Sequence, residues 1–142
     1  MKTLIRLLFL FVMVASLHAS EVWSTDYPAA LEQAAKEKKL VLLDFTGSDW
    51  CHWCQKLKAD VFSQDAFKDF AKKNLVLVEL DFPQGKIQSE KLKSQNQALQ
   101  TQYHVEGYPT LVLLDAKGKV IKQHTGSFDS PAAFVTWVGD KL

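Results

Sequence analysis

The stretch LDFTGSDWCHWCQKL, Leu43–Leu57, holds both cysteines of this 142-residue chain. The run at 40–45 is short and almost continuously apolar, a pattern typical of a strand buried on both faces of a parallel sheet. The residues at 46–49 are of the types that form a turn and begin a helix. The sequence therefore places Cys51 and Cys54 at the junction between a buried strand and a helix.

Hydrophobic spacing along the rest of the chain predicts alternating helices and strands. The expected helices are Ala29–Lys38, Cys51–Val61, a segment capped by Ser63 or Asp65, Glu90–Tyr103, and a last segment that starts at Ser130-Pro131 and turns Phe134, Val135, Val138 and Leu142 inward. The expected strands are Leu40–Phe45, Leu75–Asp81, Thr110–Leu114 and Val120–Gln123, with a hairpin turn at 115–118. Two parallel strands followed by a hairpin predict an α/β fold, a central mixed sheet flanked by helices on both faces.

The first 20 residues have the layout of a secretory signal peptide: a basic start, an apolar run and a segment of small residues. We expect cleavage after Ala19 or Ser20. The apolar run Leu4–Leu17 is too short to span a membrane, which takes about 20 residues. We therefore expect no stable membrane insertion after cleavage, and an uncleaved anchor is the less favoured alternative.

The remaining residues, 21–142, are expected to form one domain. The 17 lysines and arginines become 15 because Lys2 and Arg6 are lost, against 16 aspartates and glutamates, so the net charge is −1. The sequence has no basic stripe, and nucleic acid is therefore not an expected partner. A chain of this length buries a core without help from a disulfide, so a chemical role is expected for the cysteine pair.

The spacing of Cys51 and Cys54 suits a disulfide that opens and closes. Residues three apart on a helix have Cβ atoms about 5–6 Å apart, near the separation that a disulfide requires. In an exported protein cysteines usually form structural disulfides, but a disulfide that closes so short a loop adds little stability. Free N–H groups and the dipole at a helix N-terminus stabilise a Cys51 thiolate, and a protonated His52 adds to this effect. Cys51 is thus the expected attacking sulfur, and Cys54 the more shielded, resolving one.

Three alternative roles compete for the cysteine pair. A zinc site needs four ligands, but the chain has two cysteines and scattered histidines. Covalent haem needs C-x-x-C-H, whereas Gln55 follows Cys54. An inert buried pair is the third alternative, although Trp50, His52 and Trp53 suit a partly exposed rim better. We therefore expect neither a metal nor a cofactor.

Together with Gly107-Tyr108-Pro109-Thr110, the stretch LDFTGSDWCHWC resembles the active site of the thioredoxin-like family, over about Leu40 to Leu142. The layout is similar to secreted proteins of the disulfide-isomerase type and to the C-terminal domain of bacterial transmembrane disulfide reductases. The resemblance implies a thioredoxin-like fold and thiol–disulfide oxidoreductase activity. It also implies a cis bond before Pro109, which lies against the cysteines, and a Tyr108 backbone offered to substrate. Alternatively, Tyr108-Pro109 merely begins a strand.

The residues around the cysteines depart from thioredoxin at several points. His52-Trp53 stands where thioredoxin has Gly-Pro, and the segment 83–102 is longer and more polar. The family's buried proton-accepting aspartate is matched here by Asp44, although one extra residue separates it from Cys51. The alternative is that Asp44 caps a turn at the end of a strand. Asp49 is expected to cap the helix rather than to take part in acid–base chemistry.

These features predict an exported thiol–disulfide oxidoreductase, a reductase or isomerase that acts on protein thiols and disulfides. The strong oxidants of the family have histidine at the second position between the cysteines, where this chain has Trp53. We therefore expect a reductase or isomerase whose cysteine pair is kept reduced by a membrane or periplasmic electron donor. The absence of an N-x-[ST] acceptor and of a retention signal favours a bacterial periplasm. The alternatives are a non-catalytic binding module, or a redox sensor, that uses a groove formed by Trp50, Trp53 and Tyr108.

Overall fold

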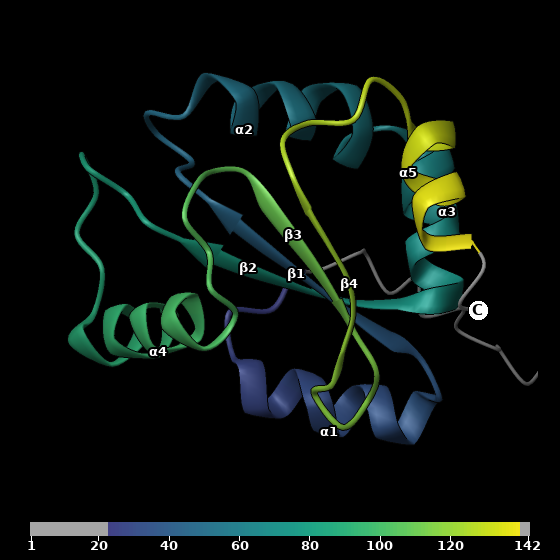
Figure 1. Cartoon of the computed structure of the whole chain (residues 1–142), viewed down its shortest axis with the longest axis horizontal. Helices are drawn as coiled ribbons and strands as arrows, with labels where there is room; N and C mark the ends of the chain where they lie inside the picture. The colour runs from purple at the N-terminus through teal and green to yellow at the C-terminus, as the bar shows by residue number, and fades with distance from the viewer. Residues whose placement is uncertain (1–22, 140–142) are drawn as a thin grey trace, which may run out of the picture.

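The computed structural model of the chain describes residues 23–139, which form a four-stranded sheet between two layers of helices (Figure 1). The strands are β1 (Leu40–Thr46), β2 (Leu75–Asp81), β3 (Thr110–Leu114) and β4 (Val120–Thr125). The helices are α1 (Tyr27–Glu37), α2 (His52–Leu57), the π-helix η1 (Lys58–Phe62), α3 (Asp65–Asn74), α4 (Glu90–Gln102) and α5 (Pro131–Val138). Between residues 23 and 139, no helix is long and apolar enough to cross a bilayer. The predicted signal peptide, its cleavage site and the position of Leu142 lie outside the described residues.

The order of the strands is β2-β1-β3-β4, and the sheet is mixed, as predicted. Strands β1 and β2 are parallel, with Leu40 opposite Leu75. Strand β3 is antiparallel to both β1 and β4. Because β1 lies inside the sheet, six of its seven residues are buried, which explains the continuous apolar run in the sequence.

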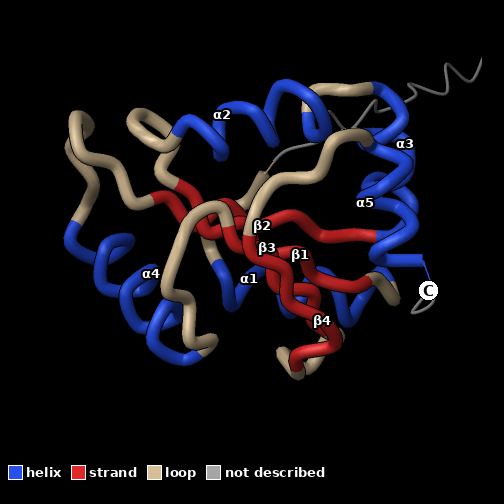
Figure 2. The backbone as a smooth tube through the Cα atoms, turned by 45° about the horizontal axis from the view of Figure 1, so that its top comes forward, coloured by secondary structure: helices blue, strands red, loops and turns tan. Residues whose placement is uncertain are grey.

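Alternation of side chains along the strands produces two separate cores, one on each face of the sheet. Helices α1 and α4 cover one face, and α2, η1, α3 and α5 cover the other (Figures 1 and 2). The first core includes Ala30, Ala34, Val41, Leu43, Phe45, Leu99 and Tyr103. The second core includes Leu42, Leu57, Val61, Phe67, Leu77, Leu111 and Phe134. Asp44 follows Leu42 by two residues, so it lies on the face covered by α2 and η1.

The predicted helix from Cys51 to Val61 is divided into two parts. Cys51 is the N-cap of α2, which ends at Leu57, and η1 continues from Lys58 to Phe62. A π-helix closes its hydrogen bonds one residue further along than an α-helix. The wider turn allows the adjacent residues Val61 and Phe62 both to be buried in the core that contains Leu57.

The structure confirms one predicted helix start and corrects another. Ser130 caps α5 with its side chain, and Pro131 is the first residue of that helix. The N-cap of α3 is Gln64, whose side chain does not cap the helix but donates to the carbonyl of Ala59 (2.8 Å), so neither Ser63 nor Asp65 caps this helix as predicted. The Ser63 hydroxyl donates instead to a carbonyl of η1 (2.8 Å), because the π-helix ends immediately before it.

The hairpin between β3 and β4 forms where predicted. One carboxylate oxygen of Asp115 accepts the N–H groups of Lys117 (2.9 Å) and Lys119 (3.0 Å). Gly118 has a φ of 81°, a conformation that favours glycine. Strand β4 continues to Thr125, two residues beyond the predicted end, because Thr125 pairs with Thr110 of β3.

Candidate functional site

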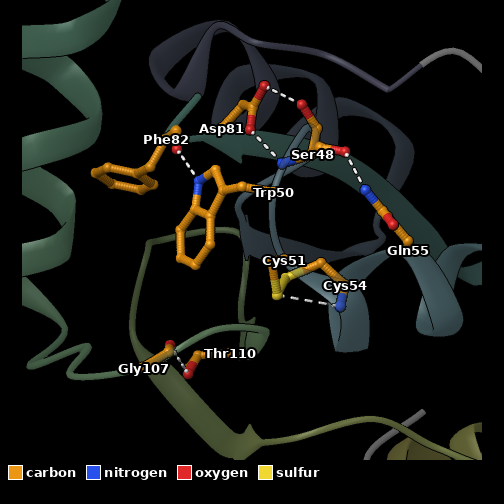
Figure 3. The surroundings of a disulfide bond; sticks show 9 residues. All are labelled: Ser48, Trp50, Cys51, Cys54, Gln55, Asp81, Phe82, Gly107 and Thr110. Atoms are coloured by element: carbon orange, nitrogen blue, oxygen red, sulfur yellow. Dashed lines mark hydrogen bonds between the residues drawn. A yellow bond between two sulfur atoms is a disulfide. The ribbon is translucent and has the colours of Figure 1, made fainter. Parts of the chain in front are cut away.

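The two cysteines form a disulfide at the N-terminus of α2, with a Cα–Cα distance of 5.2 Å (Figure 3). The backbone N–H of Cys54 donates to Sγ of Cys51 at 3.2 Å. This N–H belongs to the first turn of the helix, where backbone donors lack a partner within the helix. The sulfur of Cys51 is therefore the side-chain cap of α2, which is the arrangement that stabilises a thiolate after reduction.

The surroundings of the disulfide combine buried sulfurs with exposed aromatic rings. Cys51 is 6% and Cys54 5% exposed, so the expected stronger shielding of Cys54 is not present in the disulfide form. Trp50 is 41% and Trp53 57% exposed, and His52 is exposed as well. The expectation of a partly exposed rim is correct, and it is formed by the flanking side chains rather than by the sulfurs.

The Trp50 indole is held in place from two directions. Its Nε1–H donates to the carbonyl oxygen of Phe82 at 2.8 Å (Figure 3). Its ring and the Tyr108 ring form a T-shaped contact with a centroid distance of 5.7 Å. Trp53 instead contacts the ring of His52, with centroids 5.6 Å apart. The structure thus brings Trp50 and Tyr108 together, and it places Trp53 with His52.

The loop after β2 is attached to the active-site turn, a contact that the sequence did not reveal. The carboxylate of Asp49 accepts the N–H groups of Gln84 (3.0 Å) and Gly85 (2.7 Å), and these bonds lower the pKa of Asp49. Ser48 donates to the carboxylate of Asp81 through both its N–H and its hydroxyl (2.9 and 2.6 Å) (Figure 3). Asp49 therefore caps the neighbouring loop, and the prediction that it caps the helix is wrong because Cys51 occupies that position.

The Tyr108–Pro109 bond is cis, as the resemblance implied. Pro109 accepts the N–H of Gly126 through its carbonyl oxygen (2.9 Å). The hydroxyl of Thr110 donates to the carbonyl of Gly107 (2.8 Å), and both of these residues lie in the surroundings of the disulfide (Figure 3). The segment 107–110 is therefore fixed by hydrogen bonds on both sides of the cis bond.

Asp44 lies behind the disulfide, in the interior. It is 6% exposed and lines a cavity of about 510 Å³ together with Cys54. Its buried Oδ1 forms no hydrogen bond within the described part of the chain. The backbone N–H of Ser48, in the turn after β1, donates to Asp81 instead, which argues against Asp44 as a turn cap. Burial, followed by the negative charges of Glu79 and Asp81, raises the pKa of Asp44 to about 8, and Lys58 opposes this rise.

Comparison with known proteins agrees with the fold and the cysteine site described above. A family profile described as a thioredoxin-like domain matches residues 27–141. The disulfide bond reductase DsbH of Chlamydia pneumoniae is 41% identical over 117 residues, which cover 82% of this chain and 70% of the relative. A solved structure of a DsbH oxidoreductase has a TM-score of 0.76 and 40% identity, covering 86% of this chain and 84% of its own. The C-terminal domain of Neisseria meningitidis DsbD, oxidised, shares the fold at a TM-score of 0.59 and 21% identity, over 81% and 92% of the two chains.

The fold and the cysteine pair at the start of α2 define a thiol–disulfide oxidoreductase of the thioredoxin fold. The chain belongs to the thioredoxin-like domain family. The fold and family that the sequence predicted are confirmed. The roles of the individual site residues stay predictions.

Proposed function

We propose that the protein reduces or isomerises disulfides of exported proteins through Cys51 and Cys54. The observation that carries this proposal is the position of Cys51, whose sulfur accepts a free N–H at the start of α2 beside an exposed aromatic rim. Such a site stabilises the attacking thiolate and leaves room for a protein substrate. The similarity to a disulfide bond reductase supports the same direction of electron flow.

The reaction proceeds by two exchanges between sulfur atoms. The Cys51 thiolate attacks a substrate disulfide, forms a mixed disulfide, and releases the first substrate sulfur as a thiolate. The Cys54 thiol then loses its proton, and its thiolate attacks Sγ of Cys51. The second substrate sulfur leaves with the electron pair of the broken bond and takes a proton from solvent. The substrate gains two electrons, and the Cys51–Cys54 disulfide, the form in this structure, is the oxidised product.

Asp44 is the proposed acceptor of the Cys54 proton. Both residues line the same cavity, and one buried oxygen of the carboxylate accepts no hydrogen bond from the residues that the structure describes. A carboxyl group whose pKa is raised to about 8 exchanges protons with a thiol near neutral pH, because the pKa of an ordinary thiol is about 8.5. His52, exposed at the start of α2, is the proposed tuning residue for the Cys51 thiolate.

The front of the site is the proposed surface for substrate. The rings of Trp50 and Tyr108 are in contact, and Trp53 extends the aromatic rim with more than half of its surface exposed. An extended substrate segment would lie beside Pro109 and pair with the Tyr108 backbone. The predicted signal peptide of residues 1–20 supports export to the periplasm, where a membrane or periplasmic donor would reduce the disulfide again.

Reduction of insulin by dithiothreitol tests this function. We expect the wild-type protein to accelerate insulin reduction over many turnovers and Cys51→Ser to fall to the uncatalysed rate. Equal inactivity of the two proteins would show that the proposal is wrong. A binding module would instead bind peptide equally well after Cys51→Ser and Cys54→Ser are combined. A redox sensor would form the disulfide without multiple turnover.

A further inference from the structure

Asp44 and Glu79 lie directly opposite each other on the parallel strands β1 and β2. Neighbouring strands are about 4.8 Å apart, and paired residues carry their side chains on the same face of the sheet. Both side chains line the 510 Å³ cavity that contains Cys54. Two acidic side chains therefore share the space behind the disulfide, one of them buried and the other half-buried.

The charged groups around Asp44 come from several elements. Lys58 of η1 and Lys68 of α3 line the same cavity. Asp81 of β2 adds a second negative charge, although its carboxylate is already bonded to the turn after β1. On the other side of β1, the residue opposite Asp44 is the apolar Leu111 of β3. Negative charge thus reaches Asp44 from β2, and positive charge reaches it from Lys58 of η1.

We propose that Glu79 and Lys58 are positioning residues that set, with opposite signs, the pH at which Asp44 loses its proton and Cys54 resolves the mixed disulfide. The proposal rests on the function proposed above and adds two residues that act through Asp44. The charge of Glu79 disfavours the carboxylate form of its neighbour on β1, and the charge of Lys58 favours it. The opposed effects on the pKa of Asp44 agree with this arrangement, with burial as the largest cause.

The consequence for catalysis is a shift in the pH range of the resolving step. Asp44 accepts a proton only as the carboxylate, which predominates above about pH 8. Without the charge of Glu79, the carboxylate is available at lower pH, so Cys54 is deprotonated faster near neutrality. Without the charge of Lys58, the carboxylate appears only at higher pH, and resolution near neutrality is slower.

Titration of the Asp44 carboxyl carbon by NMR, in the oxidised protein without substrate, measures the proposed effect directly. We expect the midpoint in Glu79→Gln to move to lower pH by about one pH unit, and the midpoint in Lys58→Gln to move to higher pH by a smaller amount, because Lys58 has the weaker effect on Asp44. Glu90→Gln and Lys91→Gln are matched controls because they change the same charges on the exposed surface of α4, on the other face of the sheet. These controls should leave the midpoint where it is in the wild type.

Single-turnover reduction of saturating insulin by the reduced protein tests the link to the reaction. In both variants, we expect the pH midpoint of the single-turnover rate to move in the same direction as the titration midpoint of Asp44. In a protein that carries Asp44→Asn, Glu79→Gln should leave the pH midpoint of the rate unchanged. An unchanged Asp44 titration in both variants, or shifts of the same sign, would overturn the proposal. If the titration of Asp44 shifted while the pH profile of the single-turnover rate did not, the link to Cys54 would be overturned. Absence of insulin turnover in the wild type would refute the proposed function and leave the titration readable, so the two failures are distinguishable.

Discussion

The two sides of the Cys51–Cys54 disulfide are built in opposite ways. In front of it, the exposed Trp50 ring is held by a hydrogen bond to Phe82 and by contact with Tyr108. Behind it, Asp44 is buried beside a cavity, and its Oδ1 has no hydrogen-bond partner among residues 23–139. The front satisfies the indole N–H of Trp50 while it exposes apolar surface, which suits contact with a partner. The rear leaves a buried carboxyl unsatisfied, which opposes stability and suits proton transfer.

The largest effect is expected at the sulfur between the two sides. Cys54→Ser removes the resolving thiol and leaves Cys51 able to attack, so covalent adducts with protein substrates should accumulate and insulin turnover should fall to background. Non-reducing electrophoresis detects these adducts. Cys51→Ser is the matched control and should form none. If Cys54→Ser also formed none, Cys51 would not be the attacking residue.

A large effect on stability is expected at the rear. Asp44 is protonated in the folded protein below about pH 8, whereas it ionises near pH 4 in the unfolded chain. Its contribution to stability is therefore complete below about pH 4 and is lost as the pH rises through about 8. Asp44→Asn should raise the free energy of unfolding at pH 8 by about 2 kcal/mol or more and leave it nearly unchanged at pH 4.

Urea unfolding of the disulfide-bonded protein at the two pH values measures this difference. Asp69→Asn, on the exposed surface of α3, is a control for the loss of one acidic group and should show no such dependence. An equal effect of Asp44→Asn at pH 4 and pH 8 would mean that Asp44 is not protonated in the folded protein at neutral pH.

A moderate effect is expected at the front, at Gly47. A Cβ at this position would collide with the indole ring of Trp50, which the Phe82 carbonyl and the Tyr108 ring restrain. Gly47→Ala should therefore shift the Trp50 ring, weaken its hydrogen bond and lower the stability by about 1–3 kcal/mol. The indole N–H resonance of Trp50 and its exchange with solvent report the shift. Gly139→Ala is the control, because its Cβ would meet no atom within 4 Å. It should change neither the Trp50 resonance nor its exchange with solvent.

The smallest and most local effect is expected at Asp49. Asp49→Ala removes the acceptor for the N–H groups of Gln84 and Gly85, so their amide exchange should accelerate roughly tenfold. Because these bonds lower the pKa of Asp49, the protection in the wild type should persist until the pH falls below the usual range of an aspartate.

The hairpin of β3 and β4 supplies the control for Asp49. Asp115 likewise accepts two backbone N–H groups, and Asp115→Ala should affect the amides of that hairpin only. If exchange at Gln84 does not change in Asp49→Ala, the loop at 82–89 is fixed by its other contacts, such as the bond from Lys86 to Ser48.

The accuracy of the sequence-based predictions depends on how local each signal is. Strand β2 has the predicted bounds, and β1 ends only one residue beyond its predicted end. These predictions are accurate because an apolar run and the turn after it are defined by a few neighbouring residues. The π-helix η1 was missed, since its residues also fit the spacing of an α-helix. The role of Asp49 was misassigned, because its partners lie 35 and 36 residues further along the chain.

The sequence by itself determined that two thiols stand one turn apart at the beginning of a helix, beside tryptophans and ahead of a Tyr-Pro step. These features depend on neighbouring residues, and local backbone geometry is enough to place them. Only the tertiary structure decided that Glu79 lies opposite Asp44 and that Lys58 faces the same cavity. The register between strands 35 residues apart in the chain is set by the packing of both cores, and no short segment of sequence contains it.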